Sequence, residues 1–252
     1  VKPVDFQINK FFYKNVGKKY RWIDRLSWSE KEWIDYSSNP KVETYILKVK
    51  KDFTDIYTQE SPCGYLKEMD RLGYSISDST KPLYNTIIEQ LENTLSRPVN
   101  ILDLGSSYGI NSALMKYNLT MTELNNFFLS GTEPTKKETK QFYEKCTNND
   151  NMRFYQVDIS DEALKFSEEM DLCEKGMNVN LDDEKLELLE SLPKIDVVIA
   201  TGCIGYIGYM AFVNLLKVIK SRQINSRESK TEYNSPIFAF SVLRMFDMDD
   251  IE

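Results

Sequence analysis

Histidine is absent from this chain of 252 residues, and its absence removes several reaction mechanisms. Without an imidazole the chain can form neither a Ser-His-Asp triad nor a Cys-His nucleophile, nor a zinc site with histidine ligands. Any general base must be an aspartate, glutamate, tyrosine, lysine, cysteine or bound water. The sequence therefore excludes the commonest forms of nucleophilic catalysis.

Cysteine pairs and an excess of basic charge are also missing. The net charge is −7 and the pI is about 5.0, so we expect no nucleic acid as a partner. No Cys-x-x-Cys pair occurs, so we expect neither a disulfide framework nor a bound metal, and we expect a reducing, cytoplasmic setting. None of the four cysteines belongs to such a pair: Cys63, Cys146, Cys173 and Cys203.

Long apolar segments are scarce as well. Residues Val197–Leu216 are uncharged and about as long as a bilayer crossing. The stretch carries Gly202, Gly205 and Gly208, so we interpret it as a strand, a glycine-rich loop and the start of a helix. The N-terminus has no signal-peptide pattern, and we expect no membrane partner.

Apolar strands alternate with helical patterns in the larger part of the chain, as 41% hydrophobic residues allow. Strands are predicted at Val99–Leu104, Met152–Val157, Met177–Leu181, Ile195–Ala200 and Ile237–Leu243. Helices are predicted at Tyr65–Leu72, Pro82–Leu95, Gly109–Tyr117, Asp161–Leu172, Asp183–Leu192 and Phe212–Ile219. This alternation predicts an α/β fold with a Rossmann-like, mostly parallel sheet and helices on both faces.

Two regions stand apart from this alternation. Residues 118–151 are polar, with helical patches at Met121–Leu129 and Thr135–Cys146, and we interpret them as an inserted lid or cap. Residues 1–63 are rich in aromatics and predict a small α+β segment before a domain at 64–252. Within that segment Ser29 and Glu32 predict a capped helix start, and Val42–Val49 a strand.

The first two predicted strands end in residues suited to a nucleotide. Asp103, Gly105 and Gly109 follow the first strand, and glycines let a ligand approach backbone N–H groups. Asp158 follows the second strand, where a carboxylate can accept two hydrogen bonds from ribose hydroxyls. Two alternatives stay open: Asp158 only caps the next helix, or Glu133 is the ribose acid.

The third and fourth strands supply the other side of the expected site. Asn180 and Leu181 follow the third strand and suit an adenine edge, although Asn180 also fits a plain turn. Thr201, Gly202 and Cys203 follow the fourth strand and would face the reactive end. A small buried residue is the commoner role for a cysteine such as Cys203. Ligands of open parallel sheets bind outside the carboxyl ends of the strands, so we expect one site there.

Three segments resemble motifs of class I S-adenosylmethionine-dependent methyltransferases. Ile101–Gly109 resembles motif I, Asp158–Leu164 the second motif and Ile195–Gly202 the fourth. The resemblance implies that Asp103, Gly105 and Gly109 surround the methionine part of S-adenosylmethionine, that Asp158 holds the ribose and that Asn180 and Leu181 flank the adenine. The implied cofactor-binding residues are Asp103, Gly105, Ser106, Ser107, Tyr108, Gly109, Asp158, Ile159, Asn180, Leu181, Thr201, Gly202 and Cys203.

The chain departs from this family at three points. Ser107 replaces the usual middle glycine, and the 118–151 insert replaces a short connection. The family has seven strands against the five predicted here, which suggests that the domain lacks its last strands. Residues 10–65 resemble faintly the opening of a GNAT-type acetyltransferase, without its pyrophosphate loop, and suggest a truncated module or a cap.

The sequence therefore predicts methyl transfer from S-adenosylmethionine to a small-molecule acceptor. Candidate residues on the acceptor side are Tyr108, Tyr206 and Arg244. One alternative is a non-catalytic cofactor-binding module of a larger protein. Another is an NAD-dependent dehydrogenase, which the lack of Gly-x-Gly-x-x-Gly spacing disfavours. The sequence identifies neither the acceptor nor the oligomeric state.

Overall fold

The computed structural model describes residues 6, 9–10, 13–14, 24–39, 41–42, 54–181, 189, 191–203, 212–218 and 235–241. The chain divides into two compact units, one formed by Val1–Lys51 with Arg244–Glu252 and the other by Asp52–Leu243. The larger unit begins at Asp52 rather than at the predicted residue 64, because Ile56 and Tyr57 pack against its core.

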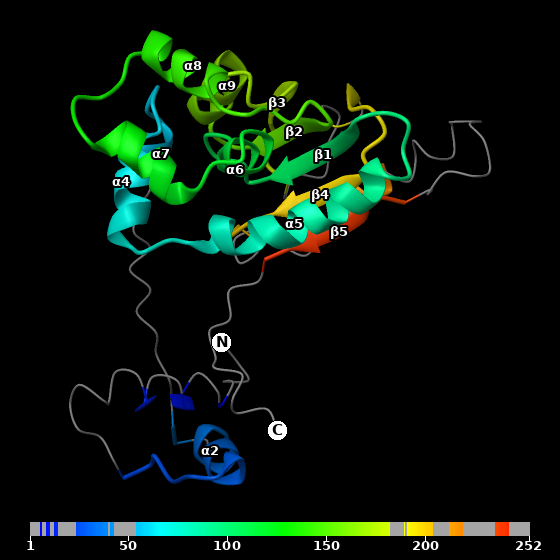
Figure 1. Ribbon diagram of the computed structural model, residues 1–252. Coiled ribbons are helices and arrows are strands. Elements are labelled where there is room, and N and C mark those ends of the chain that lie inside the picture. The colour runs from blue at the N-terminus through cyan, green and yellow to red at the C-terminus, as the bar shows by residue number, and fades with distance from the viewer. Residues whose placement is uncertain are drawn as a thin grey trace. The chain divides into compact units, whose positions relative to one another are not determined.

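The larger unit holds a parallel sheet in the order β3-β2-β1-β4-β5 among its described residues (Figure 1). The strands are β1 (Val99–Leu104), β2 (Met152–Asp158), β3 (Lys175–Asn178), β4 (Val197–Ala200) and β5 (Ile237–Phe240). Asp103 lies beside Gln156 of β2 and Ile199 of β4. The chain runs outward from β1 to β3 and then returns to β4, so the strand order reverses between β1 and β4. The predicted α/β Rossmann-like sheet is confirmed.

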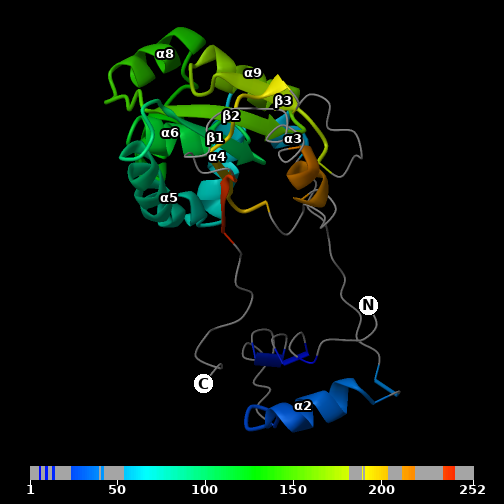
Figure 2. The ribbon, with the colours of Figure 1, turned by 90° about the vertical axis from the view of Figure 1, so that its right-hand side faces the viewer.

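Helices cover both faces of this sheet. Those of the larger unit are α3 (Thr54–Tyr57), α4 (Cys63–Arg71), α5 (Ile76–Glu92), α6 (Ile110–Lys116), α7 (Met121–Leu129), α8 (Lys136–Glu144) and α9 (Asp161–Glu169), and residues 212–218 are also helical. Figure 2 shows α5 and α6 on one side of the strands and helical residues 212–218, in orange, on the other. Alternating side chains of β1 explain this: Ile101 packs with Ile88 of α5, whereas Leu102 packs with Leu215.

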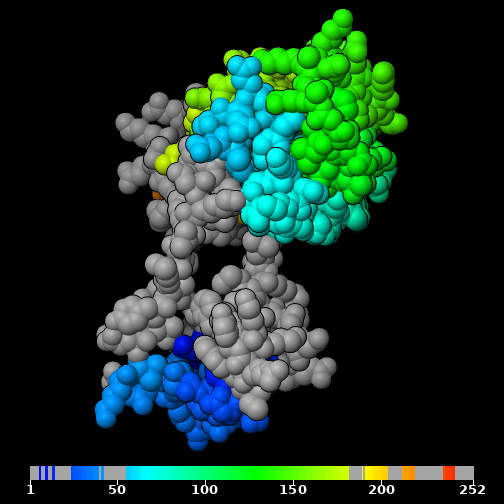
Figure 3. Space-filling model, turned by 90° about the vertical axis from the view of Figure 1, so that its left-hand side faces the viewer, coloured from blue at the N-terminus to red at the C-terminus, as the bar shows by residue number. Residues whose placement is uncertain are grey.

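The predicted lid at residues 118–151 is instead part of the core, so this interpretation was wrong. Leu124 of α7 and Tyr143 of α8 are buried in one cluster with Leu66 of α4. The rings of Phe127 and Phe142 stack at 4.1 Å, which fastens α7 to α8. In Figure 3 the cyan atoms of α4 adjoin the green atoms of α7, in agreement with their packing. The insert therefore extends the apolar core.

Several predicted boundaries shift. Helix α5 begins at Ile76 and contains Pro82, which we predicted as its start. Strand β3 begins at Lys175 and ends at Asn178, before the predicted end at Leu181. Most of the strand predicted at Val42–Val49 and of the helix predicted at Asp183–Leu192 lies outside the described residues. No helix in the described part of the chain combines the length and apolar character that a membrane crossing needs.

The smaller unit is described mainly around α2 (Glu30–Ser37). The predicted helix start is confirmed: Ser29 and Glu32 form a reciprocal capping box. Trp33 is 2% exposed and packs edge to face on Trp28 at 5.0 Å. The Arg25 guanidinium lies 4.9 Å from the Trp28 ring centroid, within the range of a cation–π contact. These aromatic contacts hold α2 against residues 24–28.

Candidate functional site

The loop after β1 is shaped by two glycines with left-handed backbone. Gly105 has φ of 64° and Gly109 has φ of 72°. A Cβ on Gly105 would lie 2.8 Å from Cys203 Cβ, and a Cβ on Gly109 would lie 2.5 Å from Ser167 Oγ. Glycine alone satisfies both the conformation and the space. The loop is thereby held close to the end of β4 and to α9.

Two serine hydroxyls inside this loop have no hydrogen-bond partner among the described residues. Ser106 and Ser107 are buried, and their Oγ atoms form no hydrogen bond within the described structure. Buried hydroxyls of folded proteins are normally paired. Two such groups in one glycine-bracketed loop therefore fit a polar ligand.

Asp158 joins the β1 loop to the end of β2. Its carboxylate accepts the Ser107 N–H at 2.8 Å and the Ser160 N–H at 3.0 Å. Burial raises the pKa of Asp158, and these N–H donors oppose that increase. The adjacent Ile159 is 73% exposed, more than any other large hydrophobic residue that the structure describes. An acid beside an exposed apolar side chain suits the ribose and base of a nucleoside.

Asp103 places a second carboxylate at this edge. It is fully buried and accepts two contacts from the Asn111 amide nitrogen, at 3.0 and 3.2 Å. The pKa of Asp103 is raised from 3.8 to about 7, mainly by burial and in part by the charge of Asp158, while the Asn111 hydrogen bond opposes the increase. Two acids in a low-dielectric region favour a positively charged ligand, which would offset their repulsion.

The end of β4 forms the third side of the site. Thr201 Oγ1 lies 3.0 Å from the Tyr84 hydroxyl, which fixes the strand end against α5. Gly202 is left-handed, with φ of 74°. The Cys203 thiol donates to the Leu104 carbonyl at 3.1 Å, and burial raises the pKa of Cys203 to about 12. Cys203 is therefore a protonated packing residue at neutral pH.

The residue of the third strand that lies beside Asp158 is not one of the predicted ones. Leu181 is 7% exposed inside the apolar core, which does not fit the predicted adenine contact. Asn180 is exposed and lies beyond the end of β3. Asn178 is the residue in register with Asp158, and its amide donates to Asp161 at 2.7 Å. The strand ends at Asn178, three residues before the end at Leu181 that its apolar pattern suggested, so this position was missed.

The candidates on the acceptor side are placed less favourably. The Tyr108 hydroxyl points at the carbonyl oxygens of Ile56 and Gln59, at 2.9 Å from each, and its ring is buried. Tyr108 is thus a packing residue rather than one that can reach an acceptor. Tyr206 and Arg244 lie outside the described residues.

Glu133, the rival ribose acid, does not follow a strand. The apolar residues before it belong to helix α7, and Glu133 is exposed beyond the end of that helix. Asp158, in contrast, ends a strand that is paired on both sides. This arrangement favours Asp158 over Glu133 at the ribose.

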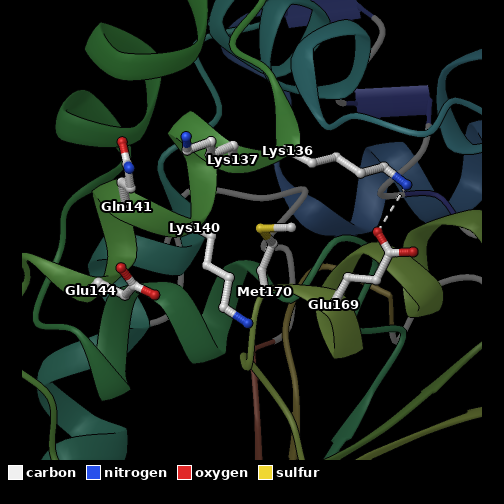
Figure 4. A pocket seen from close by; sticks show the side chains of 7 residues that line it. All are labelled: Lys136, Lys137, Lys140, Gln141, Glu144, Glu169 and Met170. Atoms are coloured by element: carbon white, nitrogen blue, oxygen red, sulfur yellow. Dashed lines mark ion pairs between the residues drawn. The ribbon is translucent and has the colours of Figure 1, made fainter.

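A cavity of about 400 Å³ lies elsewhere, between α8 and the end of α9 (Figure 4). Lys136 pairs with Glu169 at 2.9 Å, and Lys140 pairs with Asp171 at 3.1 Å. Because α9 runs back from the carboxyl end of β2, its last turn lies away from the strand ends that carry the acids. None of the predicted site residues lines this cavity, which is lined by Lys136, Lys137, Lys140, Gln141, Glu144, Glu169 and Met170.

The residues that converge are the glycine loop after β1, the Asp158–Ile159 pair after β2 and the turn after β4. They meet where the strand order reverses, which is the usual ligand position in an open parallel sheet. No protein-family model, curated protein or solved structure matches the chain.

Proposed function

We propose that this protein transfers a methyl group from S-adenosylmethionine to a small-molecule acceptor. The observation that carries the proposal is the junction of Asp158 with the glycine loop. The carboxylate lies 2.8 Å from the Ser107 nitrogen, so a ribose acid and a backbone cradle form one continuous site. The position of that junction beside the β1–β4 reversal supports a nucleoside ligand.

Each chemical part of S-adenosylmethionine has suitable residues at this edge. Asp158 offers acceptors for the ribose hydroxyls, and exposed Ile159 offers an apolar surface for adenine. The unpaired Ser106 and Ser107 hydroxyls offer partners for the polar methionine end. The Asp158 carboxylate complements the positive ammonium and sulfonium groups, and a bound cation would favour the ionised form of the nearby Asp103.

The reaction needs positioning more than proton transfer, and the chain fits that need. When bound, S-adenosylmethionine supplies an electrophilic methyl group and a neutral thioether leaving group. The Tyr84–Thr201 contact and the left-handed Gly202 fix the turn that would face the methyl group. Precise alignment of two reacting atoms supplies much of the rate in such displacements. A strong base is needed only for a protonated acceptor, so the absence of histidine is compatible with this activity.

The exchange of Asp158 for asparagine tests the proposal. D158N keeps the side-chain shape but removes the charge and one acceptor. We expect the Kd for S-adenosylmethionine, measured by calorimetry on the full chain, to rise about 30-fold, as befits lost hydrogen bonds to a carboxylate. E133Q changes the rival, exposed acid and is expected to leave the Kd within about twofold.

Two outcomes would contradict the proposal. One is a wild-type chain that does not bind S-adenosylmethionine. The other is an unchanged Kd for S-adenosylmethionine in D158N together with a raised Kd in E133Q.

A binding module without catalysis is the second candidate. Ser107 favours it, because a left-handed serine strains the loop at the position where the class I methyltransferases that the sequence resembles have glycine. Incubation with methyl-labelled S-adenosylmethionine and a fractionated pool of small metabolites separates the two. Label in any small molecule supports the enzyme, and tight binding with no labelled product supports the module.

A further inference from the structure

Tyr74 lies at the reversal of the strand order although it precedes the sheet in sequence. Its N–H donates to the Met69 carbonyl at 2.9 Å, which fixes the backbone just after α4. A Cβ on Gly202 would lie 3.0 Å from the Tyr74 hydroxyl oxygen and 3.7 Å from its Cζ. The phenol end is therefore in contact with the turn after β4.

The same turn reaches the loop after β1. Cys203 donates to the Leu104 carbonyl, and its Cβ lies 2.8 Å from where a Cβ on Gly105 would stand. Tyr74, Gly202, Cys203 and Gly105 thus form one continuous group of contacts. This group lies between the ends of β1 and β4, where the reactive end of a bound ligand is expected.

The acidic group that acts on Tyr74 is the carboxyl of Asp103. Burial raises the pKa of Tyr74, and the nearby Asp103 carboxylate and Cys203 thiol raise it further, whereas a contact with Ser77 lowers it. The phenol is therefore neutral at physiological pH. A neutral aromatic ring beside a carboxylate attracts cations through both the ring and the acid.

We propose that Tyr74 recognises the positive sulfonium of S-adenosylmethionine and discriminates it from the neutral thioether that remains after transfer. This inference rests on the proposed function. Methyl transfer removes the charge, so the attraction of Tyr74 is present before the reaction and absent after it. Tyr74 is thus a specificity residue that favours the cofactor over its product.

The test compares two ligands in four full-length chains. Calorimetry gives the Kd for S-adenosylmethionine and for S-adenosylhomocysteine with wild type, Y74L, Y74F and Y117F. Y117F is the matched control, because the Tyr117 hydroxyl faces the Asp171 carbonyl, remote from the strand ends. Thermal unfolding of each variant verifies that it is folded.

We expect Y74L to raise the Kd for S-adenosylmethionine about tenfold and the Kd for S-adenosylhomocysteine by less than about twofold, in line with the loss of a cation–π contact. If Y74F keeps the wild-type ratio of the two Kd values, the effect belongs to the ring. If Y74F loses that ratio, the effect belongs to the hydroxyl oxygen. Both results support the proposal. An equal rise of both Kd values in Y74L, or no change in their ratio, overturns the proposal. If wild type binds neither ligand, the proposed function itself fails, which is a distinct result.

Discussion

Ser107 has a backbone conformation that is unfavourable for a residue with a side chain. Its φ of 51° lies in the left-handed region, which glycine occupies without penalty and serine does not. We expect S107G to raise the free energy of unfolding by about 0.5 to 1 kcal/mol, measured by urea denaturation. The Ser107 N–H that Asp158 accepts is kept in this variant.

Ser106 provides the matched control for that prediction. It neighbours Ser107 but is not among the residues with positive φ. S106G should lower the stability, because glycine gains freedom only in the unfolded chain. A loss of stability in S107G of the same size would show that the left-handed backbone is not the source of strain.

Asp103 predicts a pH dependence of stability. Its pKa in the folded chain is about 7, above the 3.8 of an ordinary aspartate, so the folded state binds the extra proton. Its stabilising contribution is complete below about pH 4 and is lost as the pH rises through about 7. The wild-type free energy of unfolding should therefore fall over this interval by up to about 1.4 kcal/mol per pH unit from this group.

D103N isolates the contribution of that carboxyl group. The amide of D103N cannot titrate and can still pair with Asn111. As the pH rises, the free energy of unfolding of wild type should therefore fall relative to that of D103N. Urea denaturation of both chains at about pH 5 and about pH 8 measures it. Parallel changes in the two chains would mean that Asp103 is not the group that titrates.

At the scale of elements, the segment before α4 is hydrogen-bonded to the loops after β1 and β2. Residues 54–60 accept hydrogen bonds from Tyr108, in the loop after β1, and from Ser160, after β2. We expect Y108F to speed amide hydrogen exchange in this segment about tenfold, because its carbonyls lose a buried donor. Mass spectrometry of deuterated peptides measures the rates.

Tyr84 supplies the comparison for that experiment. Its hydroxyl contacts Thr201 instead, so Y84F should speed exchange near the end of β4 and leave residues 54–60 unchanged. Equal exchange in Y108F and wild type at 54–60 would mean that other contacts hold the segment.

The predictability of these elements follows from how local their signals are. The bounds predicted for β1, Val99–Leu104, and for α7, Met121–Leu129, match the structure, because each carries a complete apolar pattern between clear stop signals. The start of α5 was missed since Pro82, a common first-turn residue, lies inside the helix. The role of the insert was missed because an amphipathic helix shows that it needs a partner without showing which one.

The residues of the candidate site differ in how far the sequence alone can position them. Asp158 and the glycine loop end strands of the sheet, so the parallel topology alone brings them together. Tyr74 comes from a helix connection that no strand pattern positions, and only the packing of α4 places it at Gly202. Asn178 rather than Asn180 lies in register with Asp158, because the register of a short strand is set by its neighbour β2.

At the scale of the whole molecule, the sheet order decides where a ligand can bind. Strand β1 lies between β2 and β4, so the acid of one neighbour and the turn of the other flank a single loop. This arrangement serves nucleotides of several kinds, including nicotinamide dinucleotides. The spacing of the glycines and the two buried acids favour a cationic sulfonium nucleoside over a dinucleotide, whose pyrophosphate is negative.

Calorimetric titration of the full chain with S-adenosylhomocysteine and, separately, with NAD tests the central claim most directly. The homocysteine compound shares the adenosine and amino acid parts of the cofactor, so it should bind to the same residues. The account predicts saturable binding of S-adenosylhomocysteine with one ligand per chain and no measurable binding of NAD. Binding of NAD without binding of S-adenosylhomocysteine would contradict it.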